Sequence, residues 1–265
     1  MLLAVDIGNS NIVYGVFDGQ KWSHQWREET SIQRSLPEEE SVLRSSFLEC
    51  RLGIDQIGFV VLSSVVPERS PAIEQVLRRL FGERVLVINE RVYPHLPLQI
   101  RNPHEIGTDL VANAVAGYAR FSGALCTIVD FGTALTFTTI SPRGKILGVS
   151  IAPGLKTAIR ALSMNTAKLP EVPLAYPESA MGQNTVHAIQ SGILVGYTGL
   201  VKYTLQRIKL EVAQPGITHH VLATGGLSSI LTPLREEFDA IDALLTLDGL
   251  RLIANYYLDG QPDDY

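Results

Sequence analysis

Two short acidic turns are the first candidates for chemistry in this sequence. Asp6-Ile7-Gly8-Asn9-Ser10 and Asp130-Phe131-Gly132-Thr133-Ala134 each follow a short apolar run and precede another. An aspartate at the end of a buried strand can hold a cation directly or through water, and the glycine after it lets backbone N–H groups approach phosphate oxygens. Taken alone, such a turn is more often an ordinary Asp-Gly hairpin.

The recurrence of this turn favours the phosphate interpretation. Asp6 and Asp130 are 130 − 6 = 124 residues apart, close to half of the 265-residue chain. Hairpin turns have no reason to recur in that register, so we expect two halves built on one plan, gripping one polyphosphate from opposite sides of a cleft. Thr224-Gly225-Gly226 is a third piece, since paired glycines allow a tight turn and a flat surface for a base or ribose. Such a turn is more often a helix-entry loop.

Apolar runs separated by turn residues predict the elements that must position these turns. Strands are expected at 2–5, 12–17, 21–27, 58–62, 84–88, 125–129, 135–140, 145–151 and 218–223, and helices at 37–50, 67–80, 108–121, from about 153, 185–211 and 248–257. The first half then describes a mixed sheet with helices packed on it, and the second half repeats much of that order. The fold class is therefore α/β.

Composition and charge exclude several classes of protein. Hydrophobic residues make up 46% and charged residues 18%, which indicates a folded chain. The net charge of −5 argues against a nucleic-acid surface or a polybasic membrane surface. No apolar run approaches the roughly 18 residues that cross a bilayer, and Cys50 and Cys126 have no metal or disulfide spacing. We expect a cytoplasmic protein whose partner is a small molecule or another protein.

Sequence strings along nearly the whole chain resemble the type III pantothenate kinases, within the actin, Hsp70 and sugar-kinase superfamily. In chain order these strings occupy residues 6–11, 102–109, 130–134, 153–155, 182–185 and 224–226. The resemblance implies two ribonuclease-H-like domains, residues 1–107 and 108–265, with mixed sheets flanked by helices and ATP in the cleft between them. It also implies a kinase that phosphorylates pantothenate to 4′-phosphopantothenate, the first step of coenzyme A biosynthesis.

The resemblance assigns roles to individual residues. Asp109 would be the catalytic base, although a first-turn helix acid is its ordinary interpretation. Asp130 would hold a monovalent cation, K+ or NH4+, and Mg2+ would accompany ATP. Thr185 would contact pantothenate, although its position also suits a helix N-cap. The implied ATP-binding residues are Asp6, Ile7, Gly8, Asn9, Ser10, Asn11, Ile12, Val13 and Thr133, and the implied pantothenate-binding residues are Gly107, Thr108, Asp109, Leu110 and Thr185.

Two positions depart from the family pattern. Leu110 stands where an arginine is usual, and Ile100 stands where an aromatic residue is usual. Losing a charged hydrogen bond costs about 1.5–3 kcal/mol, so we expect weakened or re-aimed substrate binding, with Arg101 as a partial substitute for the missing guanidinium. Two alternatives therefore stay open: a nucleotide-binding accessory or regulatory relative with weak or no kinase activity, and a kinase for another small hydroxy acid.

The resemblance also implies a homodimer. Gly192, Gly196 and Gly199 thin one side of the long helix predicted at 185–211, so another helix could approach it closely. The same glycines are equally compatible with packing inside the monomer.

Overall fold

A computed structural model describes residues 1–31 and 33–260 of the chain, which divide into two compact units. Unit 1 comprises Met1–Ala116 together with the described residues from Leu245 onward, and unit 2 comprises Gly117–Leu244. The expected boundary between residues 107 and 108 differs from this division in two respects. The division falls inside helix α3 (Thr108–Arg120), and the last helix, α7 (Leu245–Asp259), belongs to unit 1.

Unit 1 is built on a mixed sheet with the strand order β3-β2-β1-β4-β5. Its central strand β1 pairs antiparallel with β2 and parallel with β4, while β3 and β5 extend the two sides antiparallel and parallel. The strands are β1 (Leu2–Ile7), β2 (Asn11–Phe17), β3 (Trp22–Glu29), β4 (Phe59–Ser64) and β5 (Val85–Val87). All five strands predicted for this half are present.

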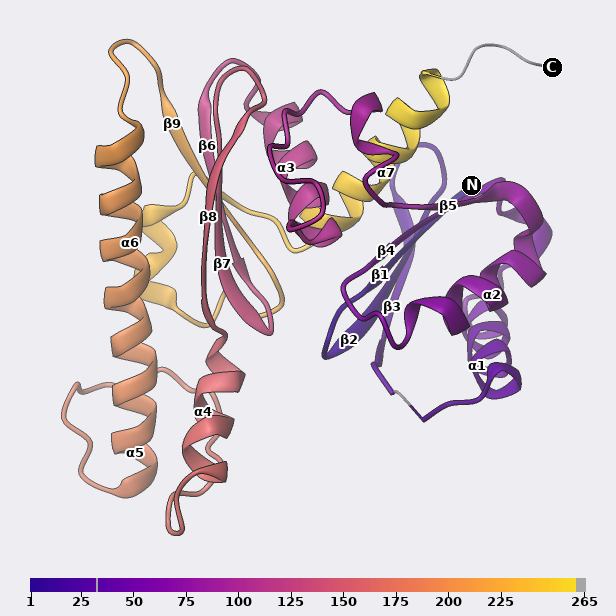
Figure 1. Cartoon of the computed structure of the whole chain (residues 1–265). Helices are drawn as coiled ribbons and strands as arrows, with labels where there is room; N and C mark the ends of the chain where they lie inside the picture. The colour runs from indigo at the N-terminus through magenta and orange to yellow at the C-terminus, as the bar shows by residue number, and fades with distance from the viewer. Residues whose placement is uncertain (32, 261–265) are drawn as a thin grey trace. The chain divides into compact units, whose positions relative to one another are not determined.

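Helices cover both faces of this sheet (Figure 1). α1 (Leu36–Glu49) and α2 (Ser70–Phe81) pack on the face formed by residues such as Tyr14 and Val16. Gly15 points the other way, where a side chain would meet Leu247 of α7. The backbone of α7 touches that of α3 where Gly249 meets Ala112, because glycine has no side chain to hold them apart. This packing explains why α7 belongs to unit 1.

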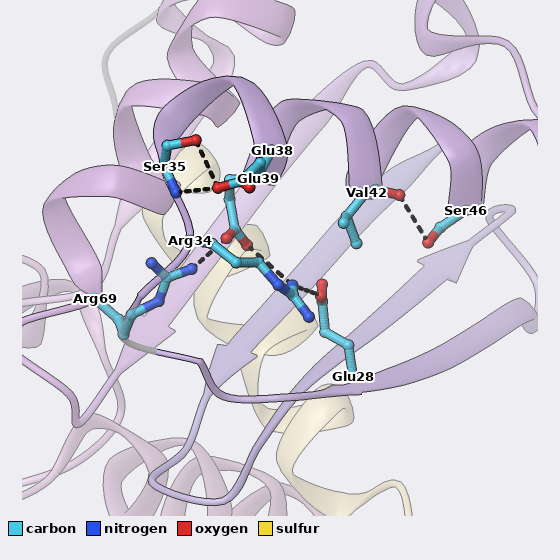
Figure 2. A network of polar contacts seen from close by, with 8 residues as sticks. All are labelled: Glu28, Arg34, Ser35, Glu38, Glu39, Val42, Ser46 and Arg69. Atoms are coloured by element: carbon cyan, nitrogen blue, oxygen red, sulfur yellow. Dashed lines mark hydrogen bonds and ion pairs between the residues drawn. The ribbon is translucent and has the colours of Figure 1, made fainter.

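An ion-pair network lies under α1 (Figure 2). Glu39 of α1 pairs with Arg69, which precedes α2, and Arg34 pairs with Glu28 of β3. Arg34 also approaches Glu39, with 3.9 Å between Nη1 and Oε1. The side chains of Arg69 and Glu39 are only 2% and 3% exposed, so water contributes little to stabilising either charge.

Unit 2 repeats the sheet of unit 1. Its order is β10-β9-β6-β7-β8, in which the central strand β6 pairs antiparallel with β7 and parallel with β9. β8 and β10 extend the two sides antiparallel and parallel, as β3 and β5 do in unit 1. The strands are β6 (Leu125–Phe131), β7 (Ala134–Ile140), β8 (Ile146–Pro153), β9 (His219–Thr224) and β10 (Ala240–Ile241). The predicted repeat of one plan is confirmed, and β10 is an addition to the predicted strands.

The helices of unit 2 differ from the sequence prediction at one point. The single helix predicted at 185–211 is interrupted, because α5 (Thr185–Gln190) and α6 (Gly196–Val212) are joined by a π-helical turn, Ser191–Val195. α4 (Leu155–Met164) follows β8 as expected. Short 3₁₀ segments occupy Ile54–Gln56, Gly82–Arg84, Tyr93–His95 and Thr232–Glu237. No helix in the described part of the chain is long and apolar enough to cross a membrane.

Candidate functional site

The first acidic turn is closed by backbone hydrogen bonds at the end of the central strand of unit 1. The Gly8 N–H donates to the Asn11 carbonyl at 3.0 Å. Thr30 holds the turn from outside, since its hydroxyl donates to the Gly8 carbonyl at 2.7 Å and its N–H donates to the Ser10 carbonyl at 3.1 Å. The backbone of this turn is therefore fixed before any ligand binds.

Four of the residues expected to bind ATP differ sharply in exposure. Ile7 and Ile12 pair across β1 and β2, and both side chains are fully buried in the core of unit 1. Asn9 and Ser10, at the tip of the turn, are exposed. The two isoleucines can therefore meet a ligand only through backbone atoms, whereas the tip residues can offer side chains.

Asp6 is connected to the first turn of α3 by a hydroxyl that the sequence motifs did not indicate. Ser63 of β4 lies beside Asp6 in the sheet register and donates to its Oδ1 at 2.9 Å. The Ser63 oxygen is also 2.9 Å from the Thr108 hydroxyl, which donates to the Ser64 carbonyl at 3.1 Å. Ser63 was missed because it stands in a buried apolar run, and its only sequence signal is a polar residue at the end of that run.

Asp109, the expected base, is the second residue of α3. Burial raises the pKa of its carboxyl above the ordinary value, although a hydrogen bond from the Leu110 N–H, 2.7 Å from Oδ1, acts in the opposite direction. Gly107 leaves room for this carboxylate, because a side chain at that position would overlap Asp109 Oδ1. The side chain of Leu110 is 8% exposed, while Arg101 is exposed.

The second acidic turn, in unit 2, is one residue shorter than the first. The Gly132 N–H donates to the Ala134 carbonyl at 3.1 Å. The Thr133 carbonyl accepts from the Gly154 N–H at 2.9 Å and from the Thr157 hydroxyl at 2.7 Å, which joins the turn to the start of α4. A side chain on Gly154 would overlap the carbonyls of this turn, so close approach requires glycine there.

The loop after β9 packs directly on Asp130. Gly225 has a φ of +90°, and a Cβ built there would lie 2.5 Å from Asp130 Oδ1 and 2.7 Å from the backbone nitrogen of Phe131. The segment Thr224-Gly225-Gly226 is therefore a tight turn, as predicted. Its backbone also packs directly against the carboxylate of Asp130. In unit 2 the structure thus brings Asp130, Gly132, Thr133 and Gly225 together.

We expect Gly225→Ala to destabilise the fold by about 1–3 kcal/mol and to weaken nucleotide binding. The left-handed backbone is strained for alanine, and the new methyl group must displace Asp130. Gly216→Ala is the matched control, since Gly216 has a φ of +76° with no atom within 4 Å of an added Cβ. Thermal unfolding and ATP titration measure both variants, and equal effects of the two would show that contact with Asp130 is unimportant.

Thr185 belongs to neither acidic turn and stands at the start of α5. The N-cap of that helix is Asn184, whose side chain accepts from the His187 N–H at 3.0 Å, so Thr185 is the first residue inside the helix. Thr185 lines a pocket of about 550 Å³ in unit 2. The pocket walls also include Leu162, Leu169, Gly182, Ile189 and Ile193. The pocket is mostly apolar with a few polar groups, as is usual for small-molecule sites.

Comparison with known proteins identifies the family. The family model described as type III pantothenate kinase matches residues 2–207. Relatives named type III pantothenate kinase from Geobacter sulfurreducens and Myxococcus xanthus are each 40% identical over 253 residues, covering 96% of this chain and 98% and 97% of theirs. The chain belongs to the type III pantothenate kinase family. The resemblance expected from the sequence is confirmed.

Solved structures agree with the actin-like fold expected for a type III pantothenate kinase. A Baf family protein from Campylobacter jejuni has a TM-score of 0.59 at 20% identity, covering 97% of this chain and 99% of that one. MreB 5 of Spiroplasma citri bound to AMPPNP has a TM-score of 0.56 at 12% identity, with 98% of both chains covered. At these identities the likeness concerns the fold alone, which in this chain consists of two mixed sheets flanked by helices.

The oxygen donors of the two turns are of the type that Mg2+, the usual companion of ATP, prefers. Mg2+ is usually held by one or two carboxylates together with phosphate and water, so a protein cage is not needed. Among residues 1–31 and 33–260 no group of three His, Cys, Asp or Glu side chains could hold a metal ion. Asp6 and Asp130, each beside a glycine turn, are carboxylates of the type that this mode of binding uses.

Proposed function

We propose that this chain catalyses the ATP-dependent phosphorylation of pantothenate to 4′-phosphopantothenate, the first step of coenzyme A biosynthesis. Family membership over nearly the whole chain supports the reaction. The observation that assigns the reaction to a particular residue is the environment of Asp109. Its carboxylate is partly buried in the first turn of α3, and burial raises its pKa. We place the reaction in the cytoplasm, in keeping with Cys50 and Cys126, which are both free thiols.

In this proposal Asp109 is the general base. Its carboxylate accepts the proton of the pantothenate 4′-hydroxyl as that oxygen forms a bond to the γ-phosphorus of ATP. The bond from the γ-phosphorus to the bridging oxygen breaks, and ADP leaves. Phosphoryl transfer depends mainly on positioning and on neutralising charge, so one base and well-placed donors are a sufficient set.

We assign the two acidic turns to the phosphates and cations. Residues Asp6 to Val13 would bind ATP in unit 1, and Thr133 would bind ATP in unit 2. Asp130 would hold K+ or NH4+, and its contact with the Gly225 turn supports this, because the turn fixes the carboxylate. When bound, Mg2+ and the monovalent ion would neutralise the charge that spreads over the phosphate oxygens.

On the pantothenate side we assign Gly107, Thr108, Leu110 and Thr185 to substrate contacts. The short distance from Gly107 to the Asp109 carboxylate and the position of Thr185 in a pocket support this assignment. The buried Leu110 side chain means that a substrate can meet this position only through backbone atoms or after a local rearrangement. Arg101, exposed on the preceding loop, stays our candidate for the missing guanidinium.

The decisive experiment is an ADP-release assay with purified protein, ATP, Mg2+ and K+. We expect ADP formation that depends on pantothenate and falls when Na+ replaces K+. A panel of other small hydroxy acids in the same assay tests for a different acceptor. Retained ATP binding without turnover on any acceptor would contradict the kinase proposal and favour an accessory protein.

We also propose a homodimer formed through unit 2. The edge strand β8 exposes Leu147, Val149 and Ile151 on one face, with Ile151 69% exposed. An added Cβ at Gly192, Gly196 or Gly199 would meet no atom within 4 Å, so these glycines face open space and do not explain packing inside one chain. Apolar side chains on an unpaired strand edge favour association.

Light scattering is expected to give twice the chain mass of 29.0 kDa at working concentration. We expect Ile151→Lys to shift the mass toward 29.0 kDa, because a charge would be buried in the contact. Leu48→Lys is the control, since Leu48 is 76% exposed but lies on α1 of unit 1. A wild-type protein of monomer mass, or equal behaviour of the two variants, would refute the proposed contact.

A further inference from the structure

Ser63 joins two parts of unit 1 that the proposed reaction uses together. Its hydroxyl donates to Asp6 at 2.9 Å, so its only proton is committed to the carboxylate. The contact with Thr108, also 2.9 Å, is then one in which the Ser63 oxygen accepts, so the single Thr108 proton is shared between the Ser63 oxygen and the Ser64 carbonyl, which is 3.1 Å away. The chain Asp6, Ser63, Thr108 therefore runs from the first phosphate turn to the helix residue directly before Asp109.

The burial of Ser63 makes this arrangement specific. The Ser63 side chain is fully buried, so water cannot replace either hydrogen bond if one partner moves. The backbone on each side is fixed as well, since Asp6 and Ser63 are register partners on parallel strands and Thr108 is bonded to the Ser64 carbonyl. A hydroxyl held in this way restricts the orientation of the Asp6 carboxylate.

The internal repeat provides independent support. Asp130 on β6 has Thr224 as its register partner on β9, just as Asp6 on β1 has Ser63 on β4. Both hydroxyl residues are buried, at 0% and 1% exposure. Each half of the repeat thus has a buried hydroxyl residue on the parallel strand beside its acidic turn. If these hydroxyl residues only filled space in the core, there would be no reason for them to recur at equivalent positions.

We propose that Ser63 is a positioning residue that orients the Asp6 carboxylate for the cation accompanying the nucleotide and ties it to the helix that carries Asp109. This rests on the proposed kinase function and adds a residue to it. Ser63 itself contacts no reacting atom in this proposal. Its effect is exerted through Asp6, so it should vanish when Asp6 has lost its charge.

Calorimetric titration with ADP, in the presence and absence of Mg2+, tests this without turnover. We expect Ser63→Ala to weaken ADP binding about ten- to a hundredfold with Mg2+, the range for a hydrogen bond to a charged group. Binding without Mg2+ should change less than about twofold on the same reasoning, because the lost bond matters only when a cation must be held. If alanine disturbs folding, Ser63→Cys is the second variant. Its side chain has a similar shape, but its thiol is only a weak hydrogen-bond donor.

Two further variants distinguish a positioning role of Ser63 from a general loss of structure. Ser63→Ala combined with Asp6→Asn should bind MgADP no more weakly than Asp6→Asn alone. Ser64→Ala removes a hydroxyl from the next residue of β4, which bonds to Ser70 on the opposite side of the sheet, and should leave binding unchanged.

The possible outcomes distinguish the two proposals. Equal weakening with and without Mg2+, additive effects in the double variant, or no effect of Ser63→Ala would overturn the positioning role and leave the kinase proposal intact. Wild-type protein that binds no MgADP would overturn both. A Mg2+-dependent loss confined to Ser63→Ala, together with pantothenate-dependent turnover by the wild type, supports both.

Discussion

Replacing Asp109 with asparagine is expected to lower kcat for pantothenate phosphorylation by about 100- to 10,000-fold, the usual contribution of a general base. Asparagine keeps the shape of the side chain but cannot accept a proton. ATP binding should persist, because the phosphate turn around Gly8 does not involve Asp109. Steady-state kinetics with ATP titration measures both effects. Glu83→Gln, an exposed carboxylate in unit 1, is the control.

The pH dependence provides a second test of Asp109. Only the deprotonated carboxylate accepts a proton, so kcat/KM for pantothenate should fall as pH drops through the pKa of Asp109. Burial raises this pKa, so the fall should begin at a higher pH than for an exposed aspartate, whose pKa is about 3.9. A wild-type profile that stays flat down to that pH, or an asparagine variant with undiminished kcat, would exclude Asp109 as the base.

Arg69→Met is expected to destabilise the protein by about 3–5 kcal/mol. The substitution leaves Glu39 as a buried charge without its main partner, which is the costly way to break an internal ion pair (Figure 2). Arg34 can compensate little, because its nearest nitrogen is 3.9 Å from the Glu39 carboxylate. Urea unfolding of the wild type and the variant measures the difference in the free energy of unfolding.

A double variant and an exposed pair complete this test. Arg69→Met combined with Glu39→Leu should recover most of the lost stability, because no unpaired charge is then buried. Arg79→Met removes a partner of Glu40, the next residue of α1, but that pair is exposed and its loss should have a much smaller effect. Similar destabilisation by Arg69→Met and Arg79→Met would mean that burial of the Glu39 pair is unimportant.

The acidic turns and the repeated sheet were predictable because their signals are local. An aspartate and a glycine directly after an apolar run predict the end of a strand. The offset of 130 − 6 = 124 residues between Asp6 and Asp130 predicts the repeat. The glycine turn at Gly225 was also predictable, although only the structure indicates that its backbone lies against Asp130. These features depend on residues that are neighbours in the chain.

The features that could not be predicted depend on residues far apart in the chain. Ser63 is 57 residues from Asp6, and Arg69 is 30 residues from Glu39, so neither pair has a local pattern. The π-helical turn Ser191–Val195 was hidden because its apolar spacing is close to that of an α-helix. The membership of α7 in unit 1 depends on contacts such as those of Gly249 with Ala112 and of Leu247 with Gly15, which connect segments that come before and after unit 2 in the sequence.

The position of α7 in the chain has a consequence for the order of folding on the ribosome. Unit 2 is continuous, so all of its strands have been synthesised when residue 244 emerges. The first strands of unit 1 emerge much earlier, yet the face around Gly15 stays uncovered until α7 follows. We therefore expect nascent chains that stop before residue 245 to contain a protease-resistant unit 2 beside a unit 1 that is still open to cleavage, although unit 1 was begun first.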